Sequence, residues 1–194
     1  TVGVQLMPVF GTQMFGSAAA KTPVAYSVTD TSGSTANAST FTFTSQAFGA
    51  EDSSRVIVVT TAGSFNNKTG SVSGITIGGV TGTEIVSVAF RSGDATAAAI
   101  YAAAVPTGTT GTVVVTLSTT TGASSRGFGI GVYRLTGPGT LAANDTNTDT
   151  GTGNRTNTLS VNTEDGGAVI ATGGGTSVLG SETYTGVTED GAGG

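Results

Sequence analysis

The chain has 194 residues and a formal net charge of −5, and only 10% of its residues are charged. It contains no cysteine, histidine or tryptophan, which excludes disulfides, the usual zinc sites and the catalytic triads or dyads that depend on histidine. Its seven lysines and arginines are scattered, so they cannot neutralise a run of phosphates and nucleic-acid binding is not expected.

The first segment of the chain combines apolar side chains with residues that break regular structure. Met7, Phe10, Met14 and Phe15 lie among Gly, Pro and Ser, without the spacing of an amphipathic helix. Such a segment buries its apolar side chains against a partner or against its own domain. We therefore expect an irregular N-terminal arm that mediates assembly, with packing on its own domain as the alternative.

The arm is expected to lead into a linker before the folded domain begins. A segment over Val24–Asp30 is followed by TSGSTANAS, a composition typical of a soft linker. We therefore predict an arm and linker over residues 1–38 and one domain over residues 39–194. Neither a secretion signal nor a membrane span is predicted, because the arm has no early Lys or Arg and no run of about 18 to 20 apolar residues occurs.

From Thr40 onwards, short β-strand patterns follow one another. Phe41 and Phe43 alternate with threonines, which is typical of a strand with one buried face. The run RVIVVTT (55–61) is continuously apolar, as in a strand covered on both faces. Further strands are predicted at 72–77, 84–90, 97–105, 112–117, 127–135, 159–162, 167–172 and 182–187. Strands at this spacing, without amphipathic helices between them, predict an all-β, jelly-roll-like antiparallel β-sandwich.

The alanine-rich segment and the end of the sequence depart from this pattern. The segment TAAAIYAAAV could form a helix, because alanine is the strongest helix former, but its neighbours are strand patterns and Pro106 and Gly108 follow closely, so we predict a strand. No closing apolar strand follows Glu182–Val187 before DGAGG. We therefore expect the sandwich to lack its last strands in this sequence.

The polar stretch after Leu135 contains one arrangement of candidate metal ligands. Asp145, Asn147 and Asp149 place oxygen atoms at alternate positions, as calcium loops do. However, the EF-hand pattern requires Gly at its sixth position and Glu at its twelfth, and here these are Thr150 and Thr156. An ordinary polar loop explains these residue types better. We therefore predict no cofactor, with a calcium ion as the alternative.

Acidic pairs are the remaining candidates for catalysis. Glycoside hydrolysis needs two carboxylates on either side of one sugar. The pairs Glu51-Asp52, Glu164-Asp165 and Glu189-Asp190 are each adjacent in sequence and lie beside Gly or Ser. Because neighbouring side chains on an extended chain point to opposite faces, these pairs are interpreted as solvated turn charges. We therefore expect no catalytic residues and no enzymatic activity.

Glycines and tyrosines offer two further binding hypotheses. Gly127, Gly129 and Gly131 alternate with apolar residues, which favours the close approach of a neighbouring chain or sheet. The tyrosines could stack on sugars, as in a lectin, and they are Tyr26, Tyr101, Tyr133 and Tyr184. Tyr101 and Tyr133 lie within strand patterns, so buried or half-buried packing is the stronger interpretation for these two.

Several runs of the chain together resemble a known domain. They are FGAEDSSRVIVVTTAGS, SGITIGGVTGTEIVS, AAIYAAAVPTGTTGTVVVTLS and RGFGIGVYRLTG, with the DGGAVIATGGG region after them. Over roughly Thr40 to Asp190 this pattern resembles a β-sandwich domain of structural proteins of tailed bacteriophages and prophages. The arm MPVFGTQMFGS also resembles the start of small virion proteins, in which such a segment anchors a displayed domain.

The resemblance implies a non-enzymatic component of the virion. Expected roles are a capsid decoration protein or a head or tail fibre, anchored through the arm to other capsid or tail proteins. Copies of the chain are expected to form a homo-oligomer, with a trimer as one form. Two other functions share the fold: a carbohydrate-binding module that attaches to a host surface glycan, and a bacterial surface adhesin.

Overall fold

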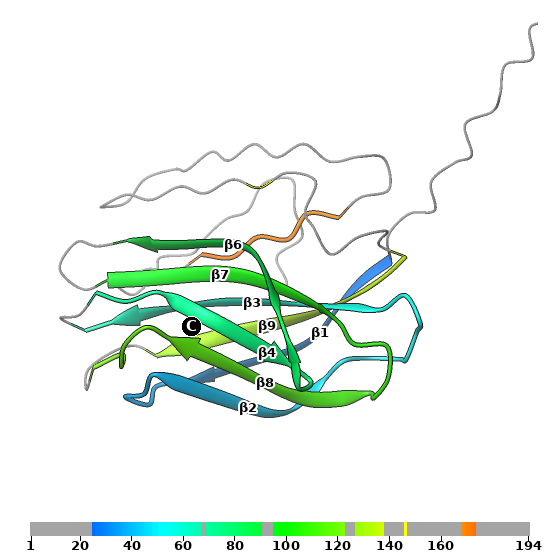
Figure 1. Cartoon of the computed structure of the whole chain (residues 1–194), viewed down its shortest axis with the longest axis horizontal. Helices are drawn as coiled ribbons and strands as arrows, with labels where there is room; N and C mark the ends of the chain where they lie inside the picture. The colour runs from blue at the N-terminus through cyan, green and yellow to red at the C-terminus, as the bar shows by residue number, and fades with distance from the viewer. Residues whose placement is uncertain are drawn as a thin grey trace, which may run out of the picture.

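The computed structural model describes residues 25–66, 69–90, 95–122, 127–137, 146 and 168–173. These residues contain nine β-strands in two antiparallel sheets and no helix (Figure 1). The strands are β1 (Ala25–Ser34), β2 (Thr40–Ala47), β3 (Val56–Phe65), β4 (Val72–Ile77), β5 (Val80–Thr81), β6 (Thr83–Phe90), β7 (Ala95–Ala104), β8 (Thr110–Leu117) and β9 (Phe128–Thr136). The predicted all-β sandwich is therefore confirmed.

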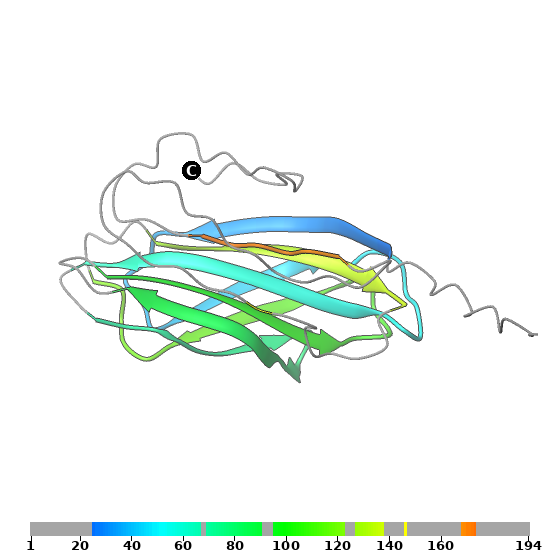
Figure 2. The ribbon, with the colours of Figure 1, turned by 90° about the horizontal axis from the view of Figure 1, so that it is seen from above.

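The strands pair as a long hairpin rolled into two layers. One sheet has the order β1-β9-β3-β7-β6 and the other has the order β2-β8-β4-β5. Pairing is nested, because β1 pairs with β9, β2 with β8, β3 with β7 and β4 with β5. This is the strand order of a jelly roll, to which β6 is added beside β7. The strands of both layers run along the long dimension of the sandwich (Figure 2).

The core lies between the two sheets. Phe41 and Phe43 of β2 are buried and the threonines that alternate with them are exposed, as predicted from this alternation. Three aromatic rings hold one end of the core together, since the Phe128 ring centre lies 5.6 Å from that of Phe41 and 5.4 Å from that of Phe65. Contacts of this kind add to the free energy gained from burying the rings.

Strand β3 is covered on both faces, as its continuous apolar run predicted. Ile57 and Val59 belong to the core between the sheets. Val56 and Val58 point to the opposite side, where they form a second apolar cluster with Ile100 and Ala102.

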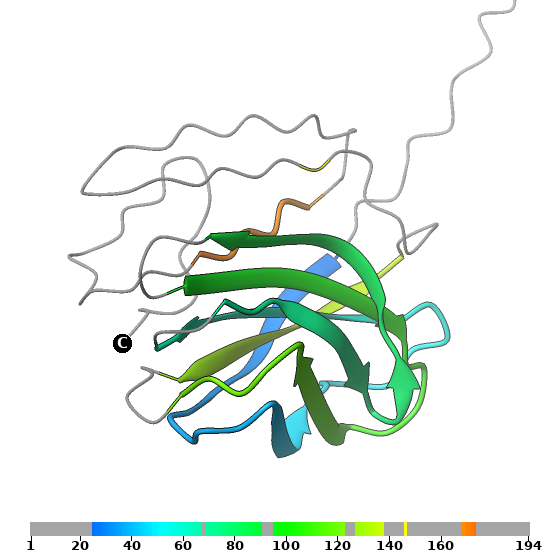
Figure 3. The same ribbon diagram turned by 60° about the vertical axis from the view of Figure 1, so that its left-hand side comes forward.

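Residues 168–173, here called the covering segment, lie over this outer face of the five-stranded sheet (Figure 3, orange). Ile170 of the covering segment packs against the outer cluster, beside the half-buried Ile85, Val86, Tyr133 and Leu135. Apolar packing thus gives the five-stranded sheet a partial third layer.

Two predictions about elements are corrected by the structure. The linker predicted after Asp30 is wrong for residues 31–34, because β1 extends to Ser34 and pairs with β9. The sheet therefore includes Ala25–Ser34, which lies within the stretch 1–38 that was expected to be arm and linker. A polar TSGS sequence can form this strand because β1 is an edge strand, and threonine suits such a position.

The strand predicted over 167–172 is also wrong, since the described residues 168–173 have no strand pairing. Ile170 packs on the face of the five-stranded sheet, so the segment lies over that face and does not add to a sheet edge. The alanine-rich segment is strand β7, as predicted, and its alanines apart from Ala104 are buried, with β7 lying between β3 and β6. The strands predicted over 159–162 and 182–187 lie outside the described residues.

Candidate functional site at the loop end of the sandwich

Arg55 is the most deeply buried charged side chain in the described part of the chain, with 1% of its surface exposed. It lies immediately before β3 and donates hydrogen bonds only to backbone carbonyl oxygens. Nε bonds Val105 at 2.6 Å, and Nη2 bonds Thr107 at 2.8 Å and Gly108 at 2.6 Å. Nη1 bonds Phe48 at 3.4 Å, Gly49 at 2.9 Å and Ala50 at 3.0 Å.

These six bonds join two loops that are far apart in the sequence. Residues 48–50 belong to the connection between β2 and β3, and residues 105–108 belong to the turn between β7 and β8. Backbone bonds support the same junction, because Phe48 N donates to Thr109 O at 2.7 Å and Asp52 N donates to Pro106 O at 3.2 Å. The guanidinium therefore fixes the relative position of two loops at one end of the sandwich.

The charge of Arg55 is stabilised by carbonyl dipoles. Burial lowers the pKa of the Arg55 guanidinium, the nearby positive charge of Arg134 lowers it further, and Glu51 and Asp52 act in the opposite direction. An arginine nevertheless stays protonated in proteins. Because all three of its nitrogens already donate to carbonyl oxygens, the guanidinium is engaged in holding the loops and is poorly placed to bind an anionic ligand.

Glu51 and Asp52 also organise this loop end. Glu51 Oε1 accepts a hydrogen bond of 2.5 Å from the backbone N–H of Gly108. Asp52 Oδ1 accepts from the hydroxyl of Ser54 at 2.6 Å and from its backbone N–H at 2.7 Å, and these bonds lower the pKa of the Asp52 carboxyl. Both carboxylates thus bind donors of the loops, in agreement with the interpretation of this pair as turn residues.

A second polar group lies on β6 and β7. The Tyr101 hydroxyl donates to Glu84 Oε2 at 2.7 Å, and the Ser87 hydroxyl donates to Glu84 Oε1 at 2.6 Å. These bonds lower the pKa of the Glu84 carboxyl, Ser87 contributing most. Burial raises the pKa of the Tyr101 phenol, and the bond to Glu84 raises it further. The pair therefore keeps a neutral phenol and an ionised carboxylate at neutral pH.

A third polar group joins the edges of the two sheets. Asp30 on β1 accepts hydrogen bonds from the backbone N–H of Thr31 at 2.8 Å and of Ala47 at 2.9 Å. The Ser32 hydroxyl donates to Gln46 Oε1 at 3.0 Å. A bulge in β2, where Ser45 adopts a positive φ of 58°, brings Ala47 and Gln46 toward β1. The bulge therefore closes this side of the sandwich.

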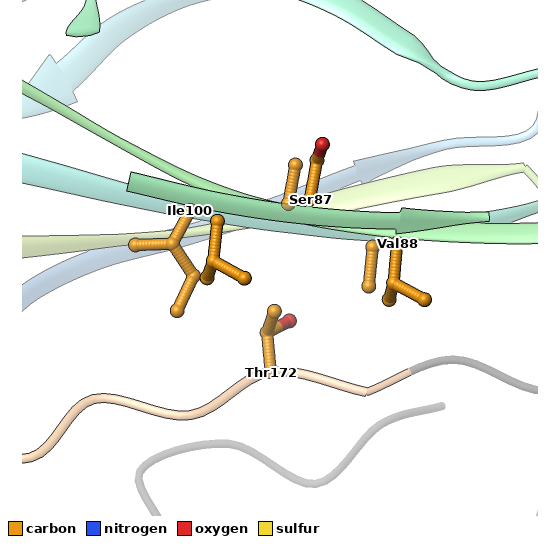
Figure 4. A pocket seen from close by; sticks show the side chains of 7 residues that line it. Ser87, Val88, Ile100 and Thr172 are labelled. Carbon is orange, nitrogen blue, oxygen red and sulfur yellow. The ribbon is translucent and has the colours of Figure 1, made fainter. Parts of the chain in front are cut away.

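A small cavity lies between β6, β7 and the covering segment (Figure 4). Val88, Ile100 and Thr172 point into it. Its volume is about 30 Å³, which is room for about two waters and far below the roughly 300 Å³ or more of a small-molecule site. The cavity is a packing gap beneath the covering segment.

The structure brings together only some of the residues singled out in the sequence. Tyr101 is buried and Tyr133 is half-buried, as predicted. A Cβ at Gly131 of β9 would lie 2.9 Å from Thr60 Oγ1 of β3 and 3.2 Å from the Tyr133 ring, so this glycine admits side chains of its own sheet. The close approach of a neighbouring chain or sheet stays a prediction. The candidates outside the described residues are Met7, Phe10, Met14 and Phe15 of the arm, Asp145, Asn147 and Asp149 of the calcium hypothesis, Tyr184, and the pairs Glu164-Asp165 and Glu189-Asp190.

Neither a group of candidate metal ligands nor a membrane-spanning helix occurs among the described residues. Among them, no cluster of three or more Asp and Glu side chains could hold a cation. No helix in this part of the chain has the length and apolar character that a membrane crossing requires.

The role of Arg55 was not predicted from the sequence, where it was read only as the first residue of an apolar run. One signal was present, since a cation adjoins four consecutive apolar residues, VIVV, in a chain with few charges. A charge at the start of a fully covered strand must find internal partners.

The chain matches no protein-family model, no curated protein and no solved structure.

Proposed function

We propose that this chain is a non-enzymatic structural protein of a tailed-phage particle, displayed on the particle surface as a capsid decoration or a head or tail fibre. The arm around Met7, Phe10, Met14 and Phe15 anchors it to capsid or tail proteins. The folded domain projects outward, and copies associate as a homo-oligomer.

One observation carries the non-enzymatic part of this proposal. Every charged side chain in the described part of the chain is bonded to backbone groups or hydroxyls that hold the fold together. These side chains are Asp30, Glu51, Asp52, Arg55, Glu84 and Arg134. Ionisable groups that perform chemistry must reach a substrate, whereas these groups connect loops, strands and sheets. Such a pattern suits a durable scaffold.

The phage assignment rests on the resemblance of the sequence between Thr40 and Asp190, and the fold is compatible with it. Jelly rolls occur in viral capsid proteins and in lectins, so the fold alone does not decide between display and glycan binding. Stacking on a sugar needs an exposed aromatic ring. Among the side chains that the structure describes, which do not include that of Tyr26, the only large apolar ones that are exposed are Val80 and Val169. We therefore rank glycan binding second.

Deleting residues 1–20 tests the anchoring role of the arm. Particles are assembled with the full-length protein or with the deleted form, and the protein is quantified on purified particles. The proposal expects the deleted form to stay folded and soluble, as measured by circular dichroism, while its incorporation into particles falls to background. Undiminished incorporation of the deleted form would show that the arm is not the anchor.

A further inference from the structure

The outward face of the four-stranded sheet differs from the rest of the described surface in its charge. Strands β2, β4, β5 and β8 contain no charged residue at all. The outward positions carry hydroxyls, methyls and one valine, namely Thr40, Thr42, Thr44, Ser73, Thr76, Thr81, Thr112, Val114 and Thr116. We call these nine residues the neutral face.

Strand register gives the neutral face a defined centre. Val114 on β8 lies directly opposite Thr42 on β2 and Thr76 on β4, and Thr76 lies opposite Thr81 on β5. These four side chains form one row across the whole sheet. The opposite side of the same strands is packed into the core, so the row is held on a rigid support.

The charge distribution favours a second copy of this chain as the partner. The chain has a net charge of −5, and the exposed acids Glu51 and Glu84 lie in the loop before β3 and on β6. Two identical copies that meet through those regions bring like charges together, which opposes association. A contact through the neutral face brings none together, and depletion of charge is characteristic of the centre of protein interfaces.

We propose that two copies of the chain associate face to face through the neutral face, about a two-fold axis near Val114. Identical surfaces in contact require such an axis, and stacked sheets pack about 10 Å apart. The inference rests on the proposed function only for the reason why copies meet, since many copies displayed on one particle lie close together.

The size of the neutral face predicts a weak contact. The strands have 8, 6, 2 and 8 residues, so strand spacing and rise give a face of about 400 Å² on each copy. The total of about 800 Å² is below the size of a stable specific interface and is that of a weak, transient one. The dimer should therefore form at high concentration in solution, and the high local concentration on a particle would favour it.

Sedimentation equilibrium of the full-length protein, up to about 1 mM, tests the proposal. Wild-type protein should show a concentration-dependent dimer. Val114→Lys and, as a second variant at an exposed position, Thr42→Lys should each raise the dimer dissociation constant at least about tenfold, because they place like charges in the contact. The matched control is Thr31→Lys, an exposed threonine on β1 of the other sheet, which should leave the constant unchanged.

A charge exchange makes the test specific for a self-contact. Val114→Lys and Val114→Glu proteins should each be monomeric alone, whereas their mixture at low salt should form a dimer again, because opposite charges then meet across the axis. The proposal is overturned by a wild type that stays monomeric, by variants that dimerise as well as the wild type, by an equal effect of Thr31→Lys, or by a mixture that stays monomeric. Each outcome is read from molecular mass, independently of incorporation into particles.

Discussion

Arg55 Nε donates a 2.6 Å hydrogen bond to the carbonyl oxygen of Val105, fifty positions later in the chain. In return, Val105 N donates to the carbonyl oxygen of Arg55 at 3.3 Å. This reciprocal pair connects the start of β3 to the end of β7 at the loop end of the sandwich. Nested strand pairing brings together segments that are far apart in the chain. A hydrogen-bonded junction between two such segments reduces the conformational freedom of the loops that it joins.

Replacement of Arg55 by Met should strongly destabilise the domain. The variant removes the guanidinium from six carbonyl oxygens, of which only Ala50 O keeps a bond, from Arg134. The cost should be about 3 to 5 kcal/mol in the free energy of unfolding. Arg55→Lys should recover only part of this loss, since one ammonium group cannot reach both loops as a guanidinium does. Urea denaturation measures the difference.

Arg134 provides the control for this experiment. It is only half-buried and donates to Ala50 O at 2.9 Å from the same region. Arg134→Ala should cost less than about 1 kcal/mol, as expected for a partly solvated bond. Equal losses in the Arg55 and Arg134 variants would mean that the buried network contributes no more than a surface bond.

Two glycines on β3 and β4, which follow each other in the chain but lie in different sheets, should respond in opposite ways to alanine. A Cβ at Gly63 of β3 would lie 2.4 Å from Gly127 O and 2.5 Å from the Phe128 ring, whereas a Cβ at Gly74 of β4 meets nothing within 4 Å. Gly63→Ala should therefore cost about 1 to 3 kcal/mol or more through overpacking. Gly74→Ala should be neutral or stabilise by up to about 1 kcal/mol. Thermal unfolding measures the stability of both variants. A Gly63→Ala protein that is more stable than the Gly74→Ala protein would contradict this interpretation.

Much of the sandwich could be predicted because its signals are local. The alternation at Phe41 and Phe43 indicates a strand with one buried face, and the apolar run from Val56 indicates a strand with both faces buried. Strand partners carry no such signal, so the nested order became visible only in the structure. The site at Arg55 could not be predicted either, because its six partners are backbone carbonyls, which every residue type has.

The Glu84 carboxyl should make the domain sensitive to acid. Its pKa is lowered in the folded state by the bonds from Ser87 and Tyr101. A carboxyl with a lowered folded-state pKa stabilises the protein above its unfolded-state pKa, and this stability is lost as pH falls through the folded-state value. The loss should therefore begin at about pH 4 and continue downwards.

Glu84→Gln tests this linkage, because an amide does not titrate in this range. Urea midpoints of wild type and variant should differ at pH 7 and converge toward pH 3. The variant keeps some acid dependence, since the pKa of the Asp52 carboxyl is also lowered. A constant difference between the two proteins from pH 7 to pH 3 would contradict the linkage.

The covering segment provides a matched pair of neighbouring positions. Ile170 packs against the outer cluster around Val58 and Ile100, whereas Val169 is 41% exposed. Ile170→Ala should cost about 1 to 2 kcal/mol, since a half-buried side chain loses part of its apolar contact. Val169→Ala should change stability by less than about 0.5 kcal/mol.

The same pair shows whether the outer face of the five-stranded sheet depends on its cover. If Ile170 shields that face, Ile170→Ala should also increase the binding of a dye specific for exposed apolar surface, with no change for Val169→Ala. Val56 and Val58 would then be partly accessible to water, and the domain should associate more readily through this face. Unchanged stability and dye binding in the Ile170 variant would mean that β3 is protected without the covering segment.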